Sequence, residues 1–445
     1  MNCIKFCTAA FTALVLTAIS AGELSFKFDC GKDTPFAKVG EKVTITGSLL
    51  LDGKPAAGQL ANVYFLFNGK TIKYLRKADA SKPFVFEYTP KTPGWISLRI
   101  YAADKKGRKM ATLTKRNGKT KTNSCYGGFG VMVEPEKLVP TMPEPEDFDK
   151  FWNGVKTELA KVPLKVIEKK QVKNKNVDIF DIKIDCAGDK PVSGYLCMPK
   201  NAKPKSLPAI LSFHGAGVRS SSRPISRAMQ GFISLDINAL GIENGHPAKF
   251  YIDLQKNLYL PKGRQPYSHW GKNDRNTFFF KGMYMRVLRA LEYVKSLPEW
   301  NGRHLVVIGS SQGGAQVLTA CALDKDVTFA KCEVPAMCDH SGCLEEHISG
   351  WPKLYNRNKQ GKPDMPEVAV CAAYYDGVNF AKRIKCPIYF STGGIDFTCP
   401  PTSVYRAYNN VPAGVFKSIV FTPGGNHGGS KNKLFENALK KHIEK

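Results

Sequence analysis

The sequence predicts an α/β fold, a mostly parallel sheet covered by helices, that follows an N-terminal immunoglobulin-like β-sandwich. Two observations carry this prediction. Short runs rich in β-branched and aromatic residues, separated by turn residues, fill residues 22–135 without a convincing helix between them. Over residues 177–445, strand-like runs alternate with runs of helical spacing, which is typical of a parallel sheet with helices on both faces.

Residues 1–21 have the pattern of a secretory signal peptide. A short start with one lysine precedes an apolar stretch from Phe6 to Ile19, and Ser20-Ala21-Gly22 offers small residues for cleavage. A membrane anchor needs roughly 20 apolar residues, which is more than this stretch has. No later segment is long enough to span a bilayer, and no Asn-x-Ser/Thr acceptor occurs. We therefore expect an exported bacterial protein, periplasmic or extracellular, without a membrane span.

The sandwich, residues 22–135, is predicted from six strands: Leu24–Phe28, Lys42–Leu51, Asn62–Phe67, Phe84–Tyr88, Trp95–Tyr101 and Phe129–Val133. Cys30 and Cys125 flank this region and could form a disulfide. Trp95 is expected in the core, because a single tryptophan in a strand does not make an aromatic platform. Three roles of the sandwich stay open: it binds glycan, it acts as a spacer, or it gates the active site.

Residues 136–176 are expected to form a linker and the first helix of the catalytic region. Acidic and proline residues from Glu136 to Pro145 indicate a semi-rigid linker. The segment Asp147-Phe148-Asp149-Lys150-Phe151-Trp152 opens an amphipathic helix that we expect to end near Ala160, with Asp147 as its N-cap.

The catalytic domain is expected over residues 177–445. Val177–Ile184 and Ser193–Met198 have the pattern of a β-hairpin. The further predicted strands are Ala209–Phe213, Gly231–Ile237, His304–Ile308, Cys386–Phe390 and Ser418–Phe421, and the predicted helices are Thr277–Ser296, Gly313–Leu323 and Lys431–His442.

The segment Gly309-Ser310-Ser311-Gln312-Gly313 matches G-x-S-x-G, the nucleophile elbow. A buried strand precedes it and a helix of small residues follows, which is the context that this motif requires. Glycines on both sides let neighbouring backbone pass close to the serine. The spacing places Ser311, and not Ser310, between the two glycines, so Ser311 is the predicted nucleophile.

A serine hydroxyl needs a base, and the base needs a carboxylate that orients it. We select His427 from the four histidines that follow the serine, His340, His347, His427 and His442. The glycine-rich segment around His427 places it on an exposed loop after a buried strand. The acid should end the preceding strand, where Asp396 stands; Asp376 and Asp339 are the alternatives.

Backbone N–H groups must bind the oxyanion that forms in the reaction. Gln312, directly after the nucleophile, supplies one. The second is expected in His214-Gly215-Ala216-Gly217, where Ala216 would donate. His214 precedes the nucleophile and is expected to be structural.

Other chemistries lack their motifs. No H-E-x-x-H, EF-hand loop, paired C-x-x-C or phosphate-binding P-loop occurs, so we expect no metal and no cofactor. The net charge of +27 comes from lysines spread along the chain. Because the sequence has no dense run of basic residues, this charge favours a lysine-rich surface over a nucleic-acid binding site.

Several segments together resemble the acetyl xylan esterase / cephalosporin C deacetylase family (carbohydrate esterase family seven). They are Gly309-Ser310-Ser311-Gln312-Gly313-Gly314, Gly394-Ile395-Asp396 with Cys399-Pro400-Pro401, the glycine-flanked His427, Asp147 to Trp152, Leu297-Pro298-Glu299-Trp300 and Val334-Pro335-Ala336-Met337-Cys338-Asp339. The resemblance covers roughly Pro140 to the C-terminus.

This resemblance implies an α/β-hydrolase fold and deacetylation of O-acetylated sugars by Ser311, His427 and Asp396 without a cofactor. The implied partner is an acetylated oligo- or polysaccharide, with a homo-oligomer as a further option. Two places depart from the family. Asn238-Ala239-Leu240-Gly241-Ile242 stands where the family usually has an Arg-Gly-Gln motif, and Ala216 stands where it tends to have tyrosine.

Two other functions stay open. Prolyl oligopeptidases share the order Ser…Asp…His, but their extra domain is normally a propeller, and about 110 residues are too few for one. The second alternative is a catalytically inactive carbohydrate-binding protein, against which the intact serine, aspartate and histidine segments argue.

Overall fold

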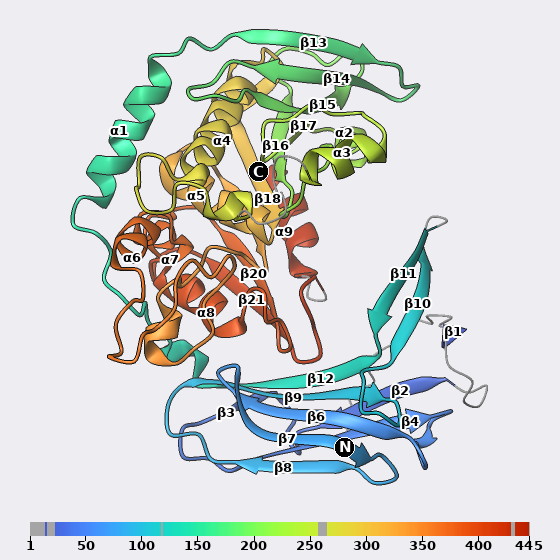
Figure 1. Cartoon of the computed structure of the whole chain (residues 1–445). Helices are drawn as coiled ribbons and strands as arrows, with labels where there is room; N and C mark the ends of the chain where they lie inside the picture. The colour runs from blue at the N-terminus through green and yellow to red at the C-terminus, as the bar shows by residue number, and fades with distance from the viewer. Residues whose placement is uncertain (1–13, 16–22, 117–118, 257–264, 429–431, 445) are drawn as a thin grey trace.

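The protein is described by a computed structural model, which covers residues 14–15, 23–116, 119–256, 265–428 and 432–444 (Figure 1). The predicted signal peptide, residues 1–21, lies outside these residues apart from Leu14–Val15, the two-residue strand β1. Among the helices of the described ranges, none is both long enough and apolar enough to cross a membrane.

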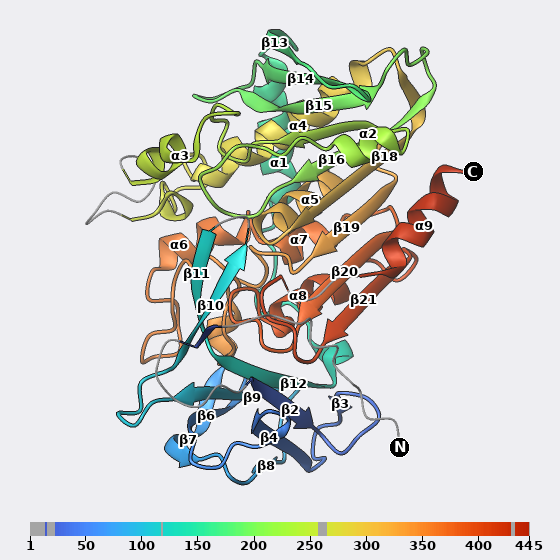
Figure 2. The same ribbon diagram turned by 90° about the vertical axis from the view of Figure 1, so that its right-hand side faces the viewer.

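A nine-stranded sheet forms the centre of the catalytic region, in the order β13-β14-β15-β17-β16-β18-β19-β20-β21 (Figure 2). Its strands are β13 (Val166–Val172), β14 (Val177–Ile184), β15 (Val192–Pro199), β16 (Leu207–Phe213), β17 (Ile233–Ile237), β18 (Trp300–Ser310), β19 (Phe329–Glu333), β20 (Ile388–Gly393) and β21 (Lys417–Thr422). From β17 to β21 all neighbours are parallel, whereas β13, β14, β15 and β17 pair antiparallel. The predicted mostly parallel sheet is confirmed.

Helices cover both faces of this sheet, as the alternation of side chains along β16 shows. Leu211 joins the larger core, whereas Ile210 packs with Phe435 on the opposite face. The larger core takes side chains from α1 (Phe148–Ala160), α4 (Phe279–Ser296), α5 (Gln312–Leu323), α6 (Pro366–Ala373), α7 (Gly377–Ala381) and α8 (Pro401–Asn410). The opposite face carries α2 (Ile225–Met229) and α9 (Leu434–Ile443), and α3 (Ala248–Leu254) joins a smaller separate cluster.

In the N-terminal region, two of the three described β-sheets enclose a core of their own. One sheet has the order β3-β12-β9-β6-β7, and in the other β4 pairs with β2, β5 and β8. The strands are β2 (Leu24–Asp29), β3 (Phe36–Ala37), β4 (Val43–Leu51), β5 (Lys54–Pro55), β6 (Leu60–Phe67), β7 (Lys70–Asp79), β8 (Phe84–Tyr88), β9 (Gly94–Ala103) and β12 (Tyr126–Val133). Val63 and Leu98 from one sheet share this core with Ile45 from the other. Cys30 and Cys125 are buried there as free thiols, so the disulfide considered above is not formed.

Several strands were not predicted, and their polar composition explains why. Nearly every residue of β7 is exposed, so its strand state follows from pairing with β6 and not from an apolar face. The strands β10 (Ala111–Arg116) and β11 (Lys119–Ser124) form a hairpin that projects from the two sheets (Figures 1 and 2).

Asp147 lies at the N-cap position of α1, as predicted, and its carbonyl oxygen accepts the first helical hydrogen bond from the Phe151 N–H at 2.9 Å. The Asp147 side chain makes no capping hydrogen bond to the helix. Its carboxylate accepts hydrogen bonds from Arg275 Nη1 at 2.8 Å and from the hydroxyl of Tyr374. Two strong donors of the catalytic region therefore replace the backbone N–H groups as its partners.

Candidate active site

Ser311 lies at the sharp turn between β18 and α5. Its backbone has φ 58° and ψ −123°, a conformation that is strained for a residue with a side chain. A Cβ atom on Gly313 would lie 2.0 Å from the carbonyl oxygen of Phe213, and one on Gly309 would lie 2.3 Å from that of Gly313. Both motif glycines are therefore needed for the backbone to pass this closely.

His427 lies on the loop after β21, within hydrogen-bond distance of the serine. Its Nε2 is 2.9 Å from Ser311 Oγ, and its Nδ1 is 2.8 Å from Asp396 Oδ2. Because a carboxylate can only accept, the ring proton belongs on Nδ1, which leaves Nε2 free to accept the serine proton. About a third of the imidazole is exposed (33%), so a substrate can reach it.

Asp396 follows β20 and is completely buried. Its Oδ1 accepts hydrogen bonds from the backbone N–H groups of Thr398, at 2.8 Å, and Cys399, at 2.9 Å. These bonds leave Oδ2 for His427. The loop after β20 thus fixes the carboxylate in one orientation. The structure brings together the serine, histidine and aspartate that the sequence predicts.

Gln312 is the first residue of α5, where backbone N–H groups lack partners within the helix. Its buried side chain accepts a hydrogen bond of 2.8 Å at Oε1 from the hydroxyl of Tyr267. Tyr267 was not predicted as a site residue, because it lies in a short 3-10 helix, Tyr267–His269, without a recognisable motif.

The His214–Gly217 segment lies beside the serine. A Cβ atom on Gly215 would be 3.5 Å from Ser311 Cβ, and Ala216 follows it with an exposed side chain. His214 Nε2 accepts from the backbone N–H of Ala239 at 3.2 Å, so Nδ1 donates to Gly215 O at 2.6 Å. Burial lowers the pKa of His214 to about 4, and the ring is therefore neutral. These contacts agree with a structural role.

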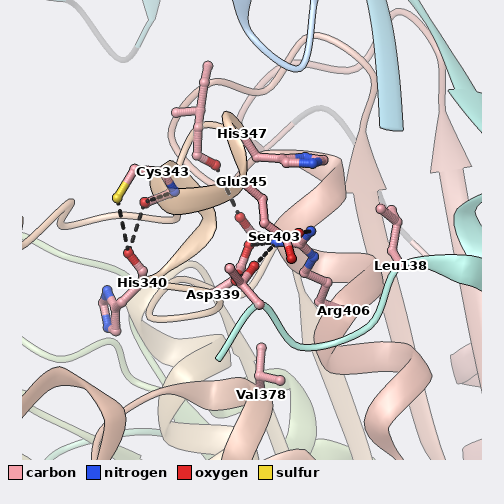
Figure 3. A network of polar contacts seen from close by, with 12 residues as sticks. Leu138, Asp339, His340, Cys343, Glu345, His347, Val378, Ser403 and Arg406 are labelled. Carbon is pink, nitrogen blue, oxygen red and sulfur yellow. Dashed lines mark hydrogen bonds and ion pairs between the residues drawn. The ribbon is translucent and has the colours of Figure 1, made fainter. Parts of the chain in front are cut away.

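The alternative acids lie in a different network. Asp376 caps α7 through the N–H of Val378 and also accepts from the N–H groups of Asp339 and His340. Asp339 pairs with Arg406 at 2.6 Å, and Arg406 also binds Glu345 (Figure 3).

The other histidines that follow the serine pack in other parts of the structure. His340 and His347 are buried, and the backbone carbonyl oxygen of His340 belongs to the network of Figure 3. His442 stacks on Phe329, with ring centroids 4.6 Å apart.

Asp396, Cys399 and His427 could also be considered as metal ligands, because their ligand atoms lie within 4.8 Å of one another. Metals bind the thiolate form of cysteine. Burial raises the pKa of Cys399 well above its usual value, which keeps this thiol protonated. These three side chains are therefore better explained by the Asp396–His427 hydrogen bond, with a neutral Cys399 beside it, than by a metal site.

The chain matches proteins of one family. A family profile described as acetyl xylan esterase (AXE1) matches residues 133–443. The acetyl esterase Axe7A of Xylanibacter ruminicola is 35% identical over 345 residues, which cover 76% of this chain and 72% of that protein.

Solved structures have the same α/β-hydrolase fold. An acetyl xylan esterase from Paenibacillus sp. R4 superposes with a TM-score of 0.58 at 27% identity and covers 70% of this chain and 98% of its own. Acetyl xylan esterase 1 from Thermoanaerobacterium sp. gives a TM-score of 0.59 at 22% identity, covering 70% of this chain and 97% of its own. The profile and the identity to Axe7A extend the likeness beyond the fold. The chain therefore belongs to the acetyl xylan esterase family and is a carboxylic ester hydrolase.

Proposed function

We propose that the chain is an exported serine esterase that removes O-acetyl groups from acetylated oligo- or polysaccharides. The observation that carries the proposal is the pair of hydrogen bonds joining Ser311 Oγ through His427 to Asp396. The family and the names of the relatives support an acetylated sugar as substrate. The signal-peptide pattern of residues 1–21 supports export.

In the first half of the reaction, Ser311 Oγ attacks the carbonyl carbon of the acetyl group while His427 Nε2 takes the hydroxyl proton. The new C–O bond pushes the carbonyl electron pair onto oxygen. We assign the backbone N–H groups of Gln312 and Ala216 as the donors to this oxyanion. Asp396 stabilises the imidazolium that forms.

When the intermediate collapses, the C–O bond to the sugar breaks and the sugar oxygen takes the proton from His427. The acetyl group then remains on Ser311. A water molecule next gives a proton to His427 and attacks the acetyl carbon, after which acetate leaves and Ser311 regains its proton. The cycle consumes one ester and one water molecule.

Acetate release from acetylated xylan by the wild type, Ser311→Ala and Ser310→Ala tests this function. We expect Ser311→Ala to lose at least about a thousandfold in kcat, because the members of such a triad act as a unit. The neighbouring Ser310→Ala is the matched control and should stay within a few-fold of the wild type. A Ser311→Ala variant with wild-type acetate release would refute the proposed nucleophile.

The same preparation separates the two alternatives. Cleavage of a chromogenic Pro-peptide without acetate release would favour a prolyl oligopeptidase-type peptidase. Binding of acetylated xylan with no turnover of either substrate would favour an inactive carbohydrate-binding protein.

A further inference from the structure

We propose that the N-terminal β-rich region positions the catalytic acid, with Arg99 and Trp95 of β9 holding the loop that carries Asp396. This inference rests on the function proposed above. The two side chains touch the loop and not the reacting atoms, so they act through Asp396 and are positioning residues.

Two hydrogen bonds fix the peptide groups just before Asp396. Trp95 Nε1 donates to the carbonyl oxygen of Gly394 at 2.7 Å, and Arg99 Nη2 donates to that of Ile395. Trp95 is completely buried, and a hydrogen bond in such surroundings is stronger than one in water. The chain entering Asp396 is therefore held at two consecutive carbonyl groups.

The residue after Asp396 is held by the same pair of side chains. Arg99 Cζ lies 3.7 Å from the ring centroid of Phe397, within the range of a cation–π contact. Trp95 meets the same ring edge-on, with centroids 4.9 Å apart at 64°. Contacts from β9 thus flank the acid on both sides.

The neighbouring strand β12 holds the loop that carries His427. The backbone N–H of Gly130 donates to Pro423 O at 2.9 Å, and Asn426 Nδ2 donates to the Tyr126 hydroxyl at 3.3 Å. The second contact is made by the residue directly before His427.

The two loops are also bonded to each other. Gly394 N donates to Thr422 O at 2.8 Å, and Ile395 N donates to Gly425 O at 2.9 Å. Both segments are rich in glycine, which costs more conformational entropy to order than other residues. Strands β9 and β12 supply contacts that offset this cost, and a displacement of about 1 Å in a catalytic group can lower a rate by about a hundredfold.

The test compares Arg99→Met, Arg99→Lys and the control Arg76→Met, which makes the same change at an exposed residue of the same sheet. Methionine keeps an apolar stem against Phe397 but donates no hydrogen bond. With an activated acetate ester, we expect Arg99→Met to lose about ten- to a hundredfold in kcat with KM within about twofold of wild type. Arg99→Lys restores a donor and should recover part of the loss. Arg76→Met should match the wild type.

Backbone amide hydrogen exchange over residues 393–399 and 422–428 gives a readout that does not need activity. We expect faster exchange in Arg99→Met, confined to these two loops. Trp95→Phe keeps an aromatic ring but removes the indole donor, and it should lose about three- to tenfold in kcat; it replaces Arg99→Met if that variant does not fold.

A wild-type kcat in both variants would overturn the inference, and so would unchanged exchange in the two loops. Failure of the proposed function looks different. In that case the wild type releases no acetate, while Arg99→Met still loosens the two loops.

Discussion

The indole N–H of Trp95 donates a hydrogen bond of 2.7 Å to the carbonyl oxygen of Gly394, two residues before Asp396. The N-terminal β-rich region is therefore bonded directly to the loop that carries the proposed catalytic acid. The acetyl xylan esterase profile begins at residue 133, so Trp95 lies outside the part of the chain that it matches. This contact joins a region beyond the profile to a loop within it.

Gly130→Ala should disturb the active site from the N-terminal side. A Cβ atom at Gly130 would lie 2.4 Å from Gly394 O and 2.7 Å from Gly394 Cα, so the acid loop must shift. We expect a loss of about tenfold or more in kcat on acetate esters. Gly154→Ala on α1 is the control, because a Cβ there would have no atom of the described part of the chain within 4 Å. Gly154→Ala should leave kcat unchanged and raise the free energy of unfolding by up to about 1 kcal/mol. Equal kcat values for Gly130→Ala and Gly154→Ala would contradict this packing argument.

Asp396→Asn should lower kcat by about ten-thousandfold while KM changes little. The asparagine oxygen can still accept from Thr398 and Cys399, so the loop keeps its shape. Its amide then faces His427 Nδ1 and favours the tautomer that cannot accept the serine proton. Steady-state kinetics check this expectation, with Asp376→Asn as the comparison: a greater loss there would assign the acid to Asp376 instead.

Stability should fall as the pH falls below about 6.5, because buried histidines stay neutral in the folded protein. Burial lowers the pKa of His340 to about 4, whereas an unfolded histidine titrates near 6.5. Between these values the unfolded chain binds a proton that the native state does not, which costs up to about 1.4 kcal/mol per pH unit for one such group. This destabilisation is absent above pH 6.5 and reaches its full size near pH 4.

His340→Leu tests that pH dependence. The residue is 1% exposed, and among the described residues neither of its ring nitrogens has a hydrogen-bond partner, so leucine removes a titrating group without breaking a side-chain hydrogen bond. Denaturant unfolding at pH 7 and pH 5 should show a smaller loss of stability in His340→Leu than in the wild type. His246→Gln, at an exposed position, should keep the wild-type difference. An unchanged difference in His340→Leu would show that this histidine does not contribute.

Arg406→Met should destabilise the protein by about 3 kcal/mol or more, because it leaves the Asp339 carboxylate buried without its cation. The two side chains are 2% and 1% exposed and 2.6 Å apart. The double variant Arg406→Met/Asp339→Leu should recover part of the loss, since no unpaired charge remains. Arg108→Met, which breaks an ion pair whose arginine is 74% exposed, should cost less than about 1 kcal/mol. Urea unfolding of the four proteins measures these differences.

The main elements of the catalytic region could be predicted because their signals are local. The glycines around Ser311 mark a turn that other residues cannot make, and His427 and Asp396 each follow an apolar strand. Since β18, β20 and β21 run parallel, their carboxyl ends meet at one edge of the sheet. That topology brings three distant segments together.

The contacts from the N-terminal region could not be predicted in the same way. Trp95 and Arg99 donate hydrogen bonds to backbone carbonyl groups that are 299 and 296 residues away in the sequence. Because every residue has a carbonyl group, the residue type at the acceptor position does not indicate such a bond. The sequence indicated that Trp95 is buried but not that it lies at the interface. Asp147 shows the same limit: the sequence predicted its N-cap position on α1, but not that its side chain binds Arg275 and Tyr374, which only the folded chain brings near.

Covalent labelling tests the proposed nucleophile most directly. The wild type is treated with a fluorophosphonate, and the modified residue is identified by peptide mass spectrometry, with Ser311→Ala and Ser310→Ala in parallel. The account predicts one label on Ser311 in the wild type and in Ser310→Ala, no label in Ser311→Ala, and loss of acetate release in step with labelling. A wild-type enzyme that releases acetate while Ser311 stays unlabelled, or while another residue takes the label, would contradict it.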